Sequence, residues 1–378
     1  MKKVKLGEIA DYSDTRINCS DLSFDNYVGT DNIKQNKQGK EFSQYTPTTG
    51  FTTEYKKNDI LIANIRPYLK KIWFATNDGG SSADVLTIRV NDKDYDSKFV
   101  YYNLFQDSFF DWAMSGSKGT KMPRGDKNQI LAFPVSDFDL PTQIAIAKVL
   151  SLLDDKIELN NKINKELEAT AKELYDYWFV QNADEGWERV RLEEIEPNII
   201  TGKTPSTNVK EYFNGTIPFI CIGDLRNNMH VIYTEQKLSV LGADTQKNKY
   251  IPEGTICVSC IATPGLISFS SEKSQTNQQL NSIVCKNEEN KYYLYFYLQD
   301  YFKNAKAKTG NTFANMNKEE FSNIVVIVPN NNLLKTFSEK VKPFIQLVLS
   351  NARQNIELAQ LRDFLLPLLM NGQVRVGK

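Results

Sequence analysis

The chain has 378 residues, of which 41% are hydrophobic and 24% charged, a composition typical of a globular protein with room for two or more domains. Its 46 basic and 46 acidic residues cancel, so the net charge gives no support for nucleic-acid binding and any basic surface must be local. No run of 18 apolar residues occurs, and no apolar signal core follows Met1-Lys2-Lys3, which argues against a membrane span or an export signal. Five cysteines, an odd number, fit a reducing cytoplasm better than a disulfide framework.

Residues 1–140 are predicted to form a β-rich domain. Strand-like runs at 60–65, 71–75 and 85–90 are separated by Asn, Asp and Gly turn signals. The aromatic segment 99–112 predicts one helix packed on those strands. A flexible Gly/Ser loop at 115–126 carries several cations and could follow a phosphate backbone.

A long helix is predicted next, over 141–180, with Thr142 as its N-cap. Its heptad seam has two asparagines in the middle, and it comprises Leu150, Leu153, Ile157, Asn160, Asn164, Leu167, Ala171, Leu174 and Trp178. Buried asparagine on such a seam lowers stability but penalises wrong registers, because its amide must find a partner.

The second half of the chain repeats the first. After a polar linker at 182–190, Arg191-Leu-Glu-Glu-Ile195 restarts the pattern of Lys5-Leu-Gly-Glu-Ile9. Segments 250–269, 280–284 and 292–300 resemble 55–74, 85–89 and 99–107. Gly310 and Asn317-Lys318 correspond to Gly119 and Asp126-Lys127. The sequence therefore predicts a tandem duplication.

The helical seam recurs 191 residues later, with its polar positions in the same places. The second seam comprises Phe344, Val348, Asn351, Asn355, Leu358, Arg362, Leu365 and Leu369. Antiparallel pairing would bring Asn160 near Asn355 and Asn164 near Asn351, in a spacer about 58 Å long. Two unrelated amphipathic helices are the alternative. The predicted fold class is α+β, with two β-rich domains separated by a long antiparallel two-helix coiled coil and an internal pseudo-twofold axis.

Signals of catalysis are missing from the sequence. The single histidine, His230, cannot build a histidine-rich metal site and is predicted to lie in a loop. Cys257 and Cys260 form a lone CxxC in an apolar setting, which indicates strand thiols. Neither a GxxxxGK[ST] loop, nor a GxGxxG in a strand-to-helix setting, nor an Asn/Asp-Pro-Pro-aromatic segment occurs. No recognisable carboxylate pair is present either.

Candidate DNA contacts lie in local clusters in both halves. Around a proline turn and in the following basic loop, the first half offers Arg66, Lys70, Lys71, Lys118, Lys121, Arg124 and Lys127. In an entry loop, an amide-rich segment and a second basic loop, the second half offers Lys203, Thr204, Ser206, Asn277, Gln278, Gln279, Lys306, Lys308, Asn311, Thr312 and Lys318. The three amides of 277–279 suit adenine edges, but they equally suit tying loops together. Lysine loops are also often no more than solvated surface.

Several segments resemble the specificity subunits of type I restriction-modification enzymes. Residues 140–179 resemble their central conserved region, and residues 355–373 resemble their C-terminal conserved region. The motifs at 201–206, 217–225 and 276–279, and at 65–70 in the first half, resemble recurrent segments of target recognition domains. The resemblance covers essentially the whole chain. It implies target recognition domains at 1–140 and 182–329, a central helix at 141–181 and a C-terminal helix at 330–378.

The resemblance also implies a function. Each domain would read one half of a bipartite, asymmetric site in double-stranded DNA. The helices would set the spacer and dock two methyltransferase subunits, with Trp178, Phe179 and residues 365–370 as apolar candidates. Those partners would bind S-adenosylmethionine and methylate adenine at N6, and restriction subunits would join them. This cytoplasmic chain would itself hold no cofactor, metal or catalytic residue.

Two alternatives come from other classes. A self-contained DNA-modifying enzyme with fused recognition modules would bind S-adenosylmethionine by itself, but the methyltransferase motifs are missing. A structural coiled-coil scaffold with protein-binding heads would show no salt-dependent affinity for DNA, whereas neutralising phosphates gives a steep salt dependence.

Overall fold

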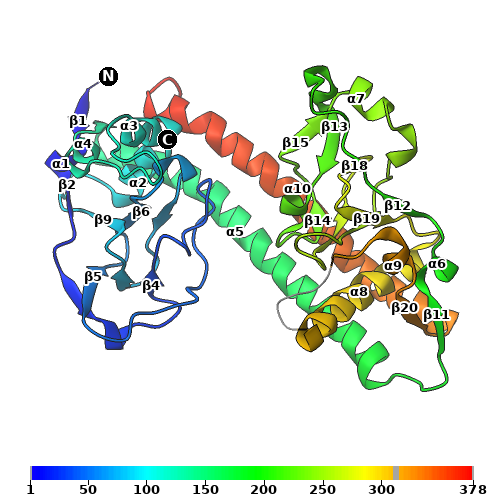
Figure 1. The fold of residues 1–378 in the computed structure, drawn as a ribbon. Helices are drawn as coiled ribbons and strands as arrows, with labels where there is room; N and C mark the ends of the chain where they lie inside the picture. Colours follow the sequence, from blue (N-terminus) through cyan, green and yellow to red (C-terminus); the bar gives the residue numbers. More distant parts are fainter. Residues whose placement is uncertain (1, 310–314, 377–378) are drawn as a thin grey trace. The chain divides into compact units, whose positions relative to one another are not determined.

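A computed structural model describes residues 2–309 and 315–376. The chain divides into two compact units (Figure 1). The first unit contains residues 1–156 and 358–378, and the second contains residues 157–357. Two long helices, α5 (Leu140–Asp176) and α10 (Asn331–Met370), each contribute one segment to each unit.

The first unit is built on two four-stranded sheets. One sheet is antiparallel, in the order β2 (Ala10–Tyr12), β9 (Val85–Val90), β6 (Ile60–Ala63), β7 (Ile72–Phe74). The other has the order β3 (Arg16–Asn18), β5 (Phe51–Tyr55), β8 (Gly79–Ser81), β4 (Tyr27–Val28), with β4 parallel to β8. A separate pair joins β1 (Lys3–Lys5) to β10 (Pro134–Ser136).

The central strand β6 is buried on both faces, which is why its sequence is continuously apolar rather than alternating. Ile60 and Ile62 pack into the core that the sheet shares with the helices. Leu61 points the other way, into a smaller core with Tyr55 and Val28. The predicted strands at 60–65, 71–75 and 85–90 are confirmed; the first two are shorter than predicted and the third has the predicted bounds.

Short helices cover the first sheet of this unit. They are α1 (Leu6–Ile9), α2 (Ser97–Phe105), α3 (Asp107–Ser115) and α4 (Lys127–Leu131), with 3-10 turns at Cys19–Asp21 and Pro67–Leu69. The prediction of one helix over 99–112 is wrong, because Gln106 adopts an extended conformation (ψ 147°) between α2 and α3. The break still allows Phe105, Phe109 and Phe110 all to enter one core.

The second unit repeats this plan. Its five-stranded sheet has the order β12 (Ile199–Thr201), β19 (Leu280–Ile283), β16 (Ile256–Ser259), β17 (Ile267–Ser270), β14 (His230–Val231). A three-stranded sheet has the order β15 (Gln236–Leu238), β13 (Phe213–Ile220), β18 (Gln275–Thr276). β11 (Glu188–Arg191) pairs with β20 (Val325–Val328). The helices are α6 (Leu192–Ile195), α7 (Val240–Asp244), α8 (Glu288–Thr309) and α9 (Lys318–Ser322), with 3-10 turns at Lys210–Tyr212, Ile222–Leu225 and Lys247–Lys249.

The duplication predicted from the sequence is confirmed element by element. β1, α1, β2, β6, β7 and β9 of the first unit correspond in order and pairing to β11, α6, β12, β16, β17 and β19 of the second. Asp126 caps α4 as Asn317 caps α9, at positions paired in the sequence. β16 is also buried on both faces, with Ile256 and Val258 in one core and Cys257 in another.

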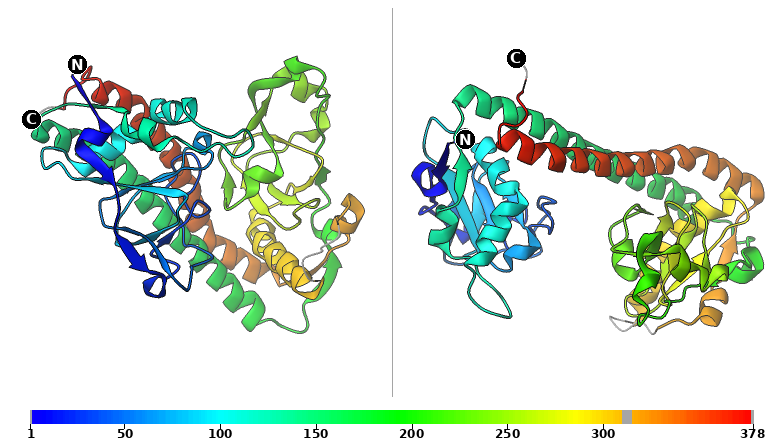
Figure 2. Two further views of the ribbon diagram at one scale, coloured as in Figure 1. Left: turned by 60° about the vertical axis from the view of Figure 1, so that its left-hand side comes forward. Right: turned by 90° about the horizontal axis from the view of Figure 1, so that it is seen from above.

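Within the second unit, α5 and α10 run side by side and antiparallel (Figure 2). Asn160 Nδ2 donates to Asn355 Oδ1 at 2.8 Å, and Asn351 Nδ2 donates to Asn164 Oδ1 at 2.8 Å. Both pairs follow the register predicted by the repeated seam. These amides can form hydrogen bonds with one another only in this register, so the two pairs specify the register of the helices.

Within the first unit, the same two helices meet through an ionic contact. Arg362 Nη1 lies 2.7 Å from Asp154 Oδ1, and Tyr102 of α2 donates to Asp154 Oδ2 at 2.7 Å. The prediction of Thr142 as the N-cap of α5 is wrong, because the helix already begins at Leu140. Gln143, fully buried, instead donates to the carbonyls of Asp94 and Phe138 and so fixes this end of the helix.

α5 ends in a π-helical turn, Tyr177–Gln181. Phe179 of this turn points inward: its ring centroid lies 4.9 Å from that of Tyr293 and 5.0 Å from that of Phe337, whereas Tyr177 is exposed. Phe179 and residues Leu366, Leu369 and Met370 are buried in the cores of their own units. The apolar docking candidates proposed from the sequence are therefore largely used inside the fold.

Candidate nucleic-acid interface

In the first unit, the basic loop is held against the end of β6 by backbone hydrogen bonds. Arg66 N donates to Pro123 O at 2.7 Å, and Gly125 N donates to Asn64 O at 3.2 Å. We call this contact, between residues 64–66 and 123–125, the first latch. Arg66 adopts the left-handed conformation there (φ 53°, ψ 62°), which side-chain-bearing residues seldom adopt.

The first latch brings together several predicted DNA-contact residues. Lys118 and Arg124 exchange two backbone hydrogen bonds of 3.0 Å, which fixes the loop as a small hairpin. Arg124 Nη2 lies 2.9 Å from Asp84 Oδ1, while Lys118 Nζ lies 3.5 Å from Asp126. Lys118, Lys121, Arg124 and Lys127 are all exposed. Together with Arg66 they form a local basic surface in a chain of zero net charge.

Two other predicted contacts of the first unit point elsewhere. Lys70 Nζ lies 3.0 Å from Asp107, which also binds Lys37 at 2.9 Å. Lys71 donates to the carbonyl of Thr30, and partial burial lowers the pKa of its amine. Both ammonium groups are thus engaged inside the unit.

In the second unit, the entry loop lies on the amide-rich segment. Lys203 N donates to Thr276 O at 3.0 Å, and Gly202 N donates to Leu280 O at 3.1 Å. Gly202 has to be glycine, because a Cβ there would lie 2.1 Å from the carbonyl oxygen of Asn277. Thr204 Oγ1 donates to Gln278 Oε1 at 2.5 Å, so these side chains join the two segments at the surface.

The three amides of 277–279 differ in their surroundings. Asn277 is buried, donates to Gln279 Oε1 at 3.1 Å and accepts from Gln279 N at 3.0 Å. Its side chain therefore ties the loop together. Gln278 is exposed and remains available at the surface with Lys203 and Ser206.

A second latch occupies the place equivalent to the first. Met316 N donates to Cys260 O at 2.9 Å, and Ala262 N donates to Asn315 Oδ1 at 3.0 Å. Ala262 is left-handed (φ 63°), as Arg66 is. Lys306 and Lys318 are exposed near this second latch in sequence. Asn311, Thr312 and the side chain of Lys308 lie outside the described residues.

Sequence reasoning found most of the basic residues but missed the latches that place them. Asn64, Asp84 and Asn315 take part in them and were not singled out. The sequence carried no signal for them, because the left-handed residue that follows a buried strand by three positions in both repeats is seen only in the structure.

The chemically reactive side chains are packed as structural groups. Burial raises the pKa of Cys257 to about 12 and that of Cys260 to about 11, so both thiols are inert at neutral pH. The prediction of His230 in a loop is wrong: it lies in β14, buried, with Nε2 3.2 Å from the carbonyl oxygen of Ile345. In the part of the chain that the structure describes, no cluster of three or more His, Cys, Asp or Glu side chains could hold a metal ion.

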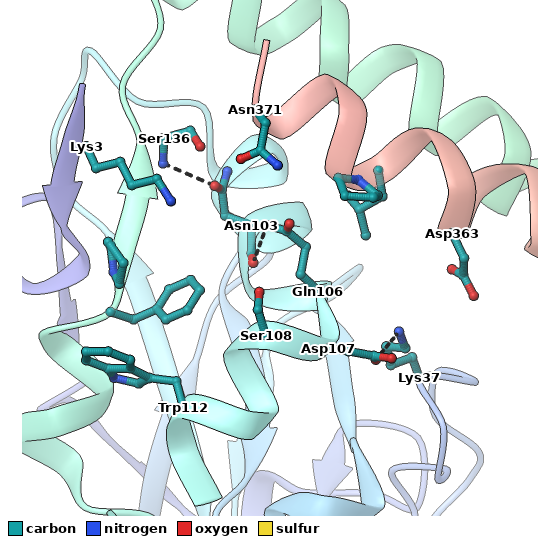
Figure 3. A pocket seen from close by; sticks show the side chains of 14 residues that line it. Lys3, Lys37, Asn103, Gln106, Asp107, Ser108, Trp112, Ser136, Asp363 and Asn371 are labelled. Atoms are coloured by element: carbon teal, nitrogen blue, oxygen red, sulfur yellow. Dashed lines mark hydrogen bonds and ion pairs between the residues drawn. The ribbon is translucent and has the colours of Figure 1, made fainter. Parts of the chain in front are cut away.

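A cavity of about 600 Å³ lies in the first unit, between the break at Gln106, strands β1 and β10, and the end of α10 (Figure 3). Its charged lining residues are Lys3, Lys37, Asp107 and Asp363, so their formal charges cancel, and Lys37 pairs with Asp107. Asn103 Oδ1 accepts from Ser136 N at 3.2 Å on its wall. The cavity includes none of the predicted DNA-contact residues. Every helix within 2–309 and 315–376 is too short or too polar to cross a membrane.

The chain contains two modules with the same fold, and each has a latch that holds a polar loop against the end of a buried strand. Two copies of such a module in one chain define a tandem recognition protein. The sequence matches the type I restriction modification DNA specificity domain over residues 1–169 and 184–360. The chain belongs to this family, the specificity subunits of type I restriction-modification systems. The predicted fold class is thereby confirmed.

The chain is 30% identical to the HindI type I specificity subunit of Haemophilus influenzae, over 84% of this chain and 87% of that protein. It is 24% identical to the MjaIX specificity subunit of Methanocaldococcus jannaschii, over 74% and 69%. The crystal structure of a type I S subunit from M. genitalium has the same fold, with a TM-score of 0.57 and 17% identity over 97% of this chain and 95% of that one.

Proposed function

We propose that each module of this specificity subunit reads one half of a bipartite, asymmetric DNA site. The observation that carries this proposal is the repeated latch. The same loop-to-strand contact occurs in both modules, but the side chains around it differ: Arg66 and Arg124 in the first, Ala262 and Asn315 in the second. One architecture with two sets of side chains is what reading two different half-sites requires.

The proposed DNA contacts lie at the first latch, at the entry loop of the second module and near the second latch. In the first module they are the partly shielded Arg66 and the exposed Lys118, Lys121, Arg124 and Lys127. In the second module they are the exposed Lys203, Ser206, Gln278, Lys306 and Lys318, with the partly buried Thr204. We assign Lys70, Lys71 and Asn277 to positioning, because their polar groups are engaged within their own unit and, unlike Lys118 and Arg124, they are not exposed.

The helix pair is proposed to set the spacer and to dock two methyltransferase subunits. On the first unit, Leu152, Leu361 and Phe364 are exposed apolar residues of α5 and α10, with Phe364 65% exposed. On the second unit, Leu159 and Leu347 are exposed on the same two helices. Large apolar side chains on a helix surface favour contact with a partner protein.

In this assembly the partners perform the chemistry. The methyltransferase subunits would bind S-adenosylmethionine and methylate adenine at N6, and restriction subunits would join them. This chain would supply only sequence recognition. We also place the complex in the cytoplasm, where the described cysteines, all free, stay reduced.

The test is to co-express the chain with its cognate methyltransferase subunit and map methylated adenines in the host genome. We expect a bipartite motif with a fixed unread gap. Exchanging residues 1–140 for another family member's first module should change one half of the motif, and exchanging residues 182–329 should change the other. A continuous motif, or one exchange that altered both halves, would contradict the proposal.

A further inference from the structure

Arg66 differs from the other arginines that are not exposed in having no carboxylate partner within the described chain. Arg66, Arg89 and Arg362 are the arginines that are not exposed. Arg89 lies 2.8 Å from Asp59, and Arg362 lies 2.7 Å from Asp154. Within residues 2–309 and 315–376, Arg66 makes no ion pair, and its Nε is buried without a hydrogen-bond partner. Partial removal of a guanidinium from water without an anionic partner costs free energy.

The backbone at Arg66 is also unfavourable for its side chain. The left-handed conformation suits glycine, yet an arginine stands there. Two residues earlier, Asn64 Oδ1 is a second buried polar atom without a partner. The segment 64–66 thus leaves a donor and an acceptor unpaired, which distinguishes it from a completed internal network.

A structural role does not account for these features. The latch is made by the backbone of residue 66, whose N donates to Pro123 O, and a glycine would make the same bond without strain. The side chain has no carboxylate to neutralise among the described residues. A strained backbone and unpaired polar atoms at a surface turn point to a ligand that forms hydrogen bonds with those atoms.

We propose that Arg66 reads a guanine base in the half-site recognised by the first module; this inference rests on the proposed DNA-reading function. The guanidinium is a planar fork that donates two hydrogen bonds to O6 and N7 of guanine in the major groove. Partial burial restricts Arg66 to few orientations, as base reading requires. The exposed cations Lys118 and Lys121 of the same surface suit phosphates, which need no fixed geometry.

The second module gives a contrasting case within the same chain. Ala262 occupies the equivalent left-handed position, and its amide binds Asn315 Oδ1. A methyl group cannot donate a hydrogen bond to guanine. The half-site of the second module is therefore read without a guanidinium at this position.

The test uses the co-expressed complex and genome-wide mapping of methylated adenine. Arg66→Lys retains the charge but removes the fork, so we expect preference for guanine at one position of one half-site to fall about tenfold or more. The other half of the motif should be unchanged. Arg16→Lys, at an exposed arginine of β3 in the same module, is the matched control and should leave the whole motif intact.

Other outcomes separate the possibilities. A phosphate contact would be preserved by Arg66→Lys, while Arg66→Ala would weaken methylation equally at all sites; that pattern overturns base reading by Arg66 but leaves the bipartite function in place. A wild-type complex without a bipartite motif would overturn the proposed function itself. An unchanged second half-site and thermal midpoint show that each variant is folded.

Discussion

Asn160 and Asn355 face each other across the helix pair of the second unit, with Asn160 Nδ2 2.8 Å from Asn355 Oδ1. Asn160 is fully buried and also donates to Gln354 Oε1, but its own Oδ1 has no partner. Asn355 in turn donates to Asn161 Oδ1 at 2.9 Å. The pair therefore contributes specificity of register at some cost in stability.

Replacing both residues by leucine (Asn160→Leu with Asn355→Leu) should raise the free energy of unfolding by roughly 1–2 kcal/mol, because an unpaired buried oxygen is removed and apolar area is gained. The register of the helix pair should at the same time loosen, because only the pair Asn164 and Asn351 still specifies it. Thermal unfolding would report the first effect, and faster amide exchange in the paired segments the second. Lys162→Leu, at an exposed position of α5, is the control. Unchanged stability with unchanged exchange would contradict the seam interpretation.

The seam and the duplication could be predicted because they are periodic. Apolar residues recur in heptads, and the two asparagines recur 191 residues later, so the register followed from the sequence alone. The latches could not be predicted in this way. Arg66 binds Pro123 through a pairing between segments that are distant in sequence, and the local sequence of neither segment indicates the other as its partner. For the same reason the sequence did not indicate that the Lys71 side chain points into its unit, since its partner Thr30 lies far from it in sequence.

The break at Gln106 and the position of His230 were missed for another reason. A helical pattern of apolar residues continues across 99–112, and one extended residue does not disturb it. His230 is polar and follows a turn-like segment, which favoured a loop, but tertiary packing against Phe269 and α10 places it in a strand.

Arg362 joins α10 to α5 and α2 within the first unit. It pairs with Asp154, and its Cζ lies 4.6 Å from the ring centroid of Phe105. Arg362→Met should lower the free energy of unfolding by about 3 kcal/mol, because Asp154 loses its partner in a largely shielded site. Denaturant unfolding measures this. The double variant Asp154→Leu with Arg362→Met should regain most of the loss, and a double variant as unstable as the single one would show that the ion pair is not its source.

His230 should make stability dependent on pH. Burial, followed by the charges of Arg353 and Lys291, lowers the pKa of His230 to about 4, although the hydrogen bond to Ile345 O acts in the opposite direction. The unfolded chain binds this proton below about pH 6.5 and the folded chain does not until about pH 4, so stability falls as pH falls through this window.

The expected loss from this group between pH 7.5 and pH 5.0 is about 2 kcal/mol. Urea unfolding at the two pH values measures it. His230→Gln keeps a donor for Ile345 O but does not titrate, so its loss over the same range should be smaller by that amount. Equal losses in the two proteins would mean that His230 is protonated in the folded state.

The basic surface at the first latch should govern the salt dependence of DNA binding. Lys118 and Lys121 are exposed, so Lys118→Gln and Lys121→Gln should each reduce the slope of log K against log salt by about 0.9. Lys71→Gln should leave that slope unchanged, because the Lys71 amine binds the carbonyl of Thr30. Binding titrations of the complex at several salt concentrations, with the target duplex, distinguish these cases. A reduced slope for Lys71→Gln would place that lysine on the DNA after all.

Phe364 tests the proposed docking surface of the helices. It is 65% exposed on α10, whereas its neighbours Leu366 and Leu369 are buried in the core of the first unit. Phe364→Asp should therefore leave the thermal midpoint of the isolated chain within error but weaken association with the methyltransferase subunit at least tenfold, since a charge would enter an apolar interface. Size-exclusion chromatography with light scattering would report the assembly. Gln360→Asp, an exposed change on the same helix that adds the same charge, should assemble normally. If both variants assembled like the wild type, the methyltransferase would dock elsewhere, and Leu159 and Leu347 on the second unit would be the next positions to change.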